Sequence, residues 1–173
     1  MAGERSPLDA VHRDRGARMV PFGGWEMPLE YATGTIAEHL ACRQSAVVFD
    51  VSHLGTVRVE GDGALDALQS TLTNDLGKIA PGRAQYTHLL DDADASVLDD
   101  IIVWWHPVGE GEPERFDVMP NASNTDRVRA AVGGIESTHE RAILAVQGPA
   151  AHERLAAVFP ADGTAISRPR SPV

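Results

Sequence analysis

The stretch Val97-Leu98-Asp99-Asp100-Ile101-Ile102-Val103-Trp104-Trp105 is the most informative part of this sequence. It is rich in the β-branched and aromatic residues that favour strands. A second run of this kind, Ala84–Leu90, precedes it, and acidic Asp91–Asp94 separate the two. Two such runs joined by a short polar segment predict a β-hairpin.

Side chains alternate across a strand, so the neighbours Asp99 and Asp100 point to opposite faces of this one. The other residues on both faces are mostly apolar, which is typical of a strand covered on two sides. An unpaired carboxylate among such neighbours is costly and has a raised pKa, so one of the two is a candidate functional acid. Alternatively, both acids lie at the mouth of the strand and take backbone or solvent contacts. The spacing alone leaves both interpretations open.

The pattern of the rest of the chain predicts helices and further strands that do not alternate strictly along the sequence. This favours an α+β fold of antiparallel and mixed sheets with packed helices. Thr35–Glu38 matches a capping box before a helix. Arg18–Gly34 holds two prolines and three glycines, and predicts a long ordered loop rather than a regular element. The expected helices begin near residues 6, 36, 65, 125 and 149, and the expected further strands cover 56–60, 115–119 and 142–146.

Composition bounds the class of protein. The chain has 173 residues, of which 43% are hydrophobic, enough for the core of about one domain. The net charge of −10 argues against general nucleic-acid binding, because affinity for phosphates needs clustered cations. The charged N-terminal segment lacks the apolar region of a secretory signal, and no apolar run is long enough to span a membrane. With Cys42 as the single cysteine, we expect a soluble, cytoplasmic protein without disulfides.

Familiar site motifs are missing from the sequence. His39 and Cys42 lie three residues apart, but two groups do not make a zinc site. The segment from Asp92 begins like a calcium loop and then places Val97 and Val103 where glycine and a bidentate glutamate are needed. No nucleophile-elbow, dinucleotide-binding or phosphate-loop motif occurs. We therefore expect no metal site.

Several segments, taken in order, resemble the T-protein (aminomethyltransferase) family of the glycine cleavage system. Each is modest alone, but their order over residues 6–160 is specific. The matching runs are 6–8, 16–20, 22–29 (Phe-Gly-Gly-Trp-Glu-Met-Pro-Leu), 49–55 (Phe-Asp-Val-Ser-His-Leu-Gly), 72–75, 84–86, 98–100, 120–124 (Pro-Asn-Ala-Ser-Asn) and 145–149.

The resemblance implies a folate-binding domain that uses tetrahydrofolate as co-substrate and the lipoylated H-protein as partner, with no nucleic acid and no membrane involved. It places the family's catalytic aspartate on Asp100. Tyr86 and Asn121 match residues that line the folate site. Leu54 stands where methionine is common and Trp104 where tyrosine is common, both in the pocket wall.

Family members continue well past this length. The resemblance therefore implies that residues 1–160 form part of a folate-binding domain, and the proline- and arginine-containing segment 161–173 is expected to be a disordered tail. Two alternatives stay open. One is a folate-binding or scaffold remnant without turnover. The other is a folate-dependent regulator of iron–sulfur protein assembly, whose cysteine-bearing signature is not visible here.

Overall fold

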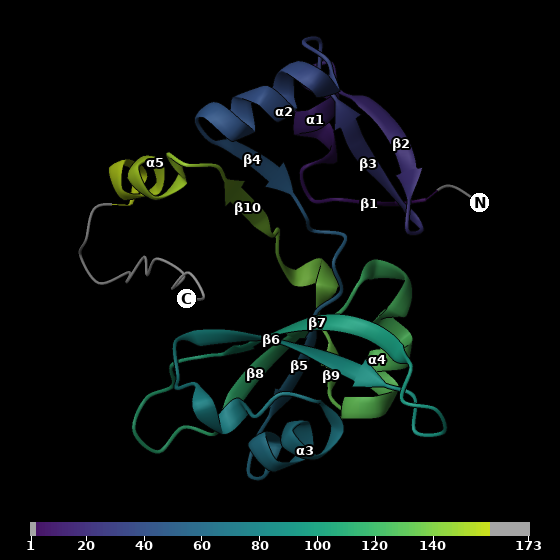
Figure 1. Cartoon of the computed structure of the whole chain (residues 1–173), viewed down its shortest axis with the longest axis vertical. Coiled ribbons are helices and arrows are strands. Elements are labelled where there is room, and N and C mark those ends of the chain that lie inside the picture. Colours follow the sequence, from purple (N-terminus) through teal and green to yellow (C-terminus); the bar gives the residue numbers. More distant parts are fainter. Residues whose placement is uncertain (1–2, 160–173) are drawn as a thin grey trace.

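The computed structural model describes residues 3–159, which form two lobes joined by two crossing segments (Figure 1). The chain leaves the first lobe after residue 50, builds the second, and returns near residue 143. The first lobe contains β1 (Glu4–Arg5), α1 (Asp9–Asp14), β2 (Arg18–Phe22), β3 (Trp25–Glu30), α2 (Thr35–Gln44), β4 (Val47–Asp50), β10 (Leu144–Gln147) and α5 (Ala151–Val158).

The second lobe is built on a five-stranded sheet of order β6-β7-β8-β5-β9. Its strands pair antiparallel, whereas the first lobe also contains a parallel pair, β1 with β3. The predicted α+β class is therefore confirmed. The elements of this lobe are β5 (Val57–Glu60), α3 (Ala64–Thr71), η1 (Leu76–Lys78), β6 (Arg83–Leu90), β7 (Val97–Trp105), β8 (Arg115–Met119), η2 (Ala122–Asn124), α4 (Thr125–Val132), β9 (Ile135–Glu136) and η3 (Thr138–Glu140).

The predicted hairpin is confirmed as β6 and β7. Tyr86 pairs with Ile102 and His88 with Asp100, so these four side chains share one face. In the connecting turn Ala95 has φ +58°, a left-handed conformation that glycine adopts at lower cost.

Only one face of the hairpin is covered by the described residues. Ile101 and Val103 of β7 pack with Phe116 of β8 against Leu68 of α3 and Val128 of α4, all fully buried. On the other face Tyr86 is 51% and Trp104 46% exposed. The expectation of apolar cover on both sides was wrong for this part of the chain, and the open face is available to a ligand.

The segment Arg18–Gly34, expected to be a loop, instead forms the β2–β3 hairpin. Gly23 and Gly24 both have positive φ and make its two-residue turn, the geometry that suits the twist of paired strands. Pro21 lies on β2, which is the edge strand, and Pro28 on β3 pairs opposite a register shift at the start of β2. Both prolines thus occupy positions where a missing N–H is tolerated.

The capping box at Thr35 was also wrong. The helix begins at Thr35 itself, after Gly34 at φ +81°. The Glu38 carboxylate accepts from the backbone N–H of Tyr31 at 2.7 Å, so it serves the preceding turn. The predicted tail, 161–173, lies outside the described residues.

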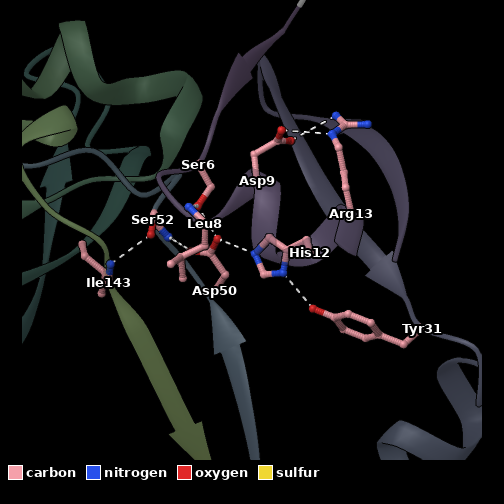
Figure 2. A network of polar contacts seen from close by, with 9 residues as sticks. All are labelled: Ser6, Leu8, Asp9, His12, Arg13, Tyr31, Asp50, Ser52 and Ile143. Carbon is pink, nitrogen blue, oxygen red and sulfur yellow. Dashed lines mark hydrogen bonds and ion pairs between the residues drawn. The ribbon is translucent and has the colours of Figure 1, made fainter. Parts of the chain in front are cut away.

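A buried polar network fixes the first lobe at its junction with the second (Figure 2). Asp50, at the end of β4, accepts hydrogen bonds from the hydroxyl of Ser6, from His12 Nε2 at 2.8 Å and from the backbone N–H of Ser52 at 2.9 Å. His12 Nδ1 lies 2.7 Å from the Tyr31 hydroxyl. The Ser52 hydroxyl accepts from the N–H of Ile143 at 3.0 Å, which binds the outgoing chain segment to the returning one.

Candidate functional site

The candidate site is centred on Asp100, near the start of β7 on the open face. Tyr86, diagonally across the strand pair, donates its hydroxyl to one carboxylate oxygen of Asp100. Asn121 Nδ2 lies 2.7 Å from the other oxygen, Oδ1. The structure thus brings together three of the five residues that the sequence comparison singled out.

Asn121 is held in place by the neighbouring acid, Asp99. This carboxylate is buried, and it accepts from the backbone N–H of Asn121 at 3.0 Å, from Asn121 Nδ2 at 2.8 Å and from Asn124 Nδ2 at 2.9 Å. Asp99 therefore orders the turn after β8, while Asp100 is exposed on the open face of the sheet. Asp99 takes a backbone contact, as the alternative expected, but it is buried and also accepts from two side-chain amides, which neither interpretation anticipated.

Trp104 and Leu54 lie farther from the carboxylate. Trp104 shares the open face with Asp100 but is four residues along the strand, about 13 Å at 3.3 Å per residue. Its ring stacks on His106, with centroids 5.9 Å apart. Leu54 is half-buried in the segment between β4 and β5, where the N–H of Gly55 donates to Pro120 at 3.0 Å. That bond places the Leu54 segment next to the turn that carries Asn121, but Leu54 does not line the pocket beside Asp100.

A pocket of about 420 Å³ lies beside Asp100, where the β2–β3 turn of the first lobe meets the second lobe. Phe22 and Gly23 line one side of it, and Asp99, Asp100 and Asn121 line another. The lobes are close here, because a Cβ built on Gly23 would lie 3.1 Å from the Cβ of Ala122.

His53 also lines this pocket and was not singled out from the sequence. Its ring meets that of Phe22 edge to face, with centroids 5.2 Å apart. Burial lowers the pKa of His53, although the charge of Asp50 acts in the opposite direction, so the imidazole is neutral near pH 7. Both His53 and Phe22 fall in runs that carry the family resemblance, and this was the available signal for them.

The arrangement suits a flat, polar heterocycle. A carboxylate fixed by a phenol and an amide can accept N–H groups or stabilise positive charge. The exposed faces of Tyr86 and Trp104 offer apolar contact for an aromatic ring. Among residues 3–159 no group of three or more His, Cys, Asp or Glu side chains is placed to hold a metal ion. No helix in the same range is both long and apolar enough to cross a membrane.

Comparisons with known proteins agree with this geometry. The sequence is 48% identical over 161 residues to an aminomethyltransferase of Deinococcus deserti, a match that covers 88% of this chain and 43% of that protein. It is 46% identical over 173 residues to an aminomethyltransferase of a Parafrankia species, covering 94% of this chain and 46% of the relative. The chain thus spans less than half the length of these relatives.

The fold has a counterpart of known structure, the glycine cleavage system aminomethyltransferase T from Bartonella henselae. The two superpose with a TM-score of 0.73 at 34% sequence identity, over 89% of this chain and 43% of that one. The sequence model of the GCVT N-terminal domain matches residues 8–168. This protein therefore belongs to the GCVT N-terminal domain family.

Proposed function

We propose that this chain binds tetrahydrofolate on the open face of β6 and β7 and takes part in aminomethyl transfer to it. The observation that carries the proposal is the Asp100 carboxylate, which two neutral donors, Tyr86 and Asn121, hold beside an exposed aromatic surface. The reaction class, aminomethyl transfer, is taken from the similar proteins, which are named aminomethyltransferases.

The residues of the open face fit a reduced pterin. This ring is flat and carries several N–H donors, which Asp100 accepts. Tyr86 and Trp104 provide the ring contacts, Asn121 closes the side toward the turn after β8, and the segment of Leu54 lies behind that turn. Apolar walls with a few fixed polar groups are the usual make-up of a small-molecule site.

Asp100 is the catalytic residue in this proposal. The aminomethyl group arrives on the lipoyl arm of the H-protein, and its carbon–nitrogen and carbon–sulfur bonds break. Two folate nitrogens form new bonds to the same carbon and give up their protons, so ammonia and the dihydrolipoyl thiol leave. Positive charge builds on the methylene carbon and then on the folate nitrogens, and a fixed carboxylate stabilises it. Tyr86 and Asn121 position that carboxylate in advance. We place this activity in the cytoplasm.

A second candidate is a folate-binding protein without turnover. The exposure of Tyr86 and Trp104 favours it, because a pterin placed against them would be contacted by the described residues on one side only. The two candidates share a binding site and differ in catalysis.

An assay of 5,10-methylenetetrahydrofolate formation separates them. The chain is mixed with tetrahydrofolate and with H-protein that carries the aminomethyl group on its lipoyl arm. Release of ammonia in step with methylenetetrahydrofolate, dependent on lipoylation, supports the transferase. Binding of tetrahydrofolate without either product supports the second candidate. If the chain neither binds tetrahydrofolate nor forms product, both candidates are wrong.

A further inference from the structure

His53 is a histidine of the candidate site to which the proposed function gives no role. It lies between β4 and β5 and lines the pocket of about 420 Å³ beside Asp100. It also lines a second pocket, of about 200 Å³, together with Trp25 and His139. Ala122 lines both pockets as well. The His53 side chain therefore stands where two pockets at the junction of the lobes adjoin.

Packing holds the ring of His53. Phe22 meets it edge to face, with ring centroids 5.2 Å apart. Its Nδ1 is buried without a partner among the described residues. Buried His12, by contrast, has both ring nitrogens paired, Nε2 with Asp50 at 2.8 Å and Nδ1 with the Tyr31 hydroxyl at 2.7 Å. Since Nδ1 of His53 is buried, Nε2 is the ring nitrogen left to exchange a proton with a molecule in the pocket.

The surroundings of His53 keep its imidazole neutral near pH 7. Burial lowers the pKa of His53, and the charge of Asp50, which acts in the opposite direction, does not cancel this effect. The other titratable side chains that line its two pockets are Asp99, Asp100, Glu4, Asp126, Glu136 and His139. A neutral imidazole can accept a proton and, because its pKa is not far from neutrality, can also return it.

The proposed transfer needs a group that moves protons. Two folate nitrogens each lose a proton as they bond the methylene carbon, and the amine and the sulfur each take one as they leave. The oxygens of Asp100 already accept from Tyr86 and Asn121. Those of Asp99 accept from Asn121 and from a second amide on the same turn. Of the described residues that line the pocket beside Asp100, His53 is the remaining titratable one.

We propose that His53 is the general base and acid of the transfer, carrying protons from the folate nitrogens to the groups that leave the methylene carbon. The proposal rests on the proposed function and adds a second catalytic residue to Asp100. As one folate nitrogen bonds the carbon, neutral His53 accepts the proton that this nitrogen gives up. Protonated His53 donates it to the amine nitrogen as the carbon–nitrogen bond breaks, so ammonia leaves and the imidazole is neutral again. A second cycle moves the proton of the other folate nitrogen to the sulfur as the carbon–sulfur bond breaks.

The test measures formation of methylenetetrahydrofolate by wild type, His53→Gln, His53→Ala and the matched control His39→Gln. His39 lies exposed on α2. We expect His53→Gln to slow turnover by at least about a hundredfold, as is usual when a general acid–base group is lost, while tetrahydrofolate affinity changes by less than about twofold. His39→Gln should change neither. Added imidazole should restore part of the rate of His53→Ala and none of that of Asp100→Asn, because a free base replaces only the missing ring.

The pH profile of turnover is the second readout. Only neutral His53 accepts a proton, so the wild-type rate should fall as the pH drops through a midpoint below about 6.5, the ordinary value for histidine. His53→Gln should lack this step. A side chain that only supports the pocket would change neither the pH profile nor the response to imidazole.

Wild-type turnover by His53→Gln would overturn the role of His53 and leave Asp100 and the pterin site standing. A slow His53→Ala that imidazole does not restore, together with a His53→Gln profile that keeps the wild-type step, would do the same. A wild-type chain that binds tetrahydrofolate but forms no product would overturn the role of His53 together with the transferase. A wild-type chain that binds no tetrahydrofolate would overturn the pterin site as well.

Discussion

Replacing Asp50 with alanine is expected to lower the free energy of unfolding by about 3–5 kcal/mol, because three donors lose the acceptor they share and each unsatisfied buried donor costs about 1–3 kcal/mol. The Asp50 side chain is fully buried and that of His12 is 8% exposed. The substitution leaves His12 Nε2, the Ser6 hydroxyl and the N–H of Ser52 without their shared acceptor. Unpaired buried donors are costly because they have lost their bonds to water. Urea denaturation near pH 7 measures the loss.

Asp126→Ala is the matched control. Asp126, like Asp50, accepts a hydrogen bond from a basic side chain: Arg129 lies 3.2 Å away. The Asp126 side chain, however, is 94% exposed. We expect this change to cost less than about 1 kcal/mol, as for other surface pairs. Similar unfolding free energies for the two variants would show that the Asp50 network does not stabilise the junction of the lobes.

The same network predicts the direction of the pH dependence. Burial raises the pKa of Asp50, but hydrogen bonds from Ser52, Ser6 and His12 together outweigh it, and the pKa is lowered from its ordinary value. A carboxyl whose pKa is lower in the folded state contributes stability above its unfolded pKa of about 4, and loses it as the pH falls toward the folded value. The stability difference between wild type and Asp50→Asn should therefore narrow from about pH 7 to about pH 3. A constant difference would contradict this account.

Asp99→Ala is expected to have the second largest effect, a loss of about 2–3 kcal/mol, because buried Asp99 accepts three hydrogen bonds from Asn121 and Asn124. The same change should weaken tetrahydrofolate binding, since Asn121 is no longer held against Asp100. Urea denaturation and ligand titration measure the two effects.

Asp100→Ala separates stability from binding. Asp100 is exposed, so its loss should change stability by less than about 1 kcal/mol while it weakens binding. Asp100→Ala is thus the control for Asp99→Ala. If Asp99→Ala left both the free energy of unfolding and tetrahydrofolate binding unchanged, Asp99 would not position Asn121.

Local patterns predicted the second lobe well. The β6–β7 hairpin follows from alternating β-favouring residues around an acidic turn, which are interactions close in sequence. The β2–β3 hairpin was missed because glycine and proline usually mark loops, and only the strand order shows that Pro21 lies on an edge. Its Gly23-Gly24 turn was the overlooked local signal.

Contacts between distant residues could not be predicted in this way. His12 and Asp50 are separated by 38 positions, and Arg141 and Asp117 by 24. No local periodicity relates such pairs, because the order of strands and the junction of the lobes bring them together. The family resemblance singled out Asp100, Tyr86 and Asn121, which the fold brings into contact, whereas the bonds by which Asp99 orders the turn depend on partners 22 and 25 positions away.

The central claim is that the open face at Asp100 binds a pterin. Its most direct test is a titration of tetrahydrofolate into the wild-type chain, Asp100→Asn and the control Asp66→Asn, whose residue lies exposed on α3. The account predicts saturable binding by wild type and by Asp66→Asn, and binding at least about tenfold weaker for Asp100→Asn. Binding of equal strength by Asp100→Asn, or no binding by the wild-type chain, would contradict it.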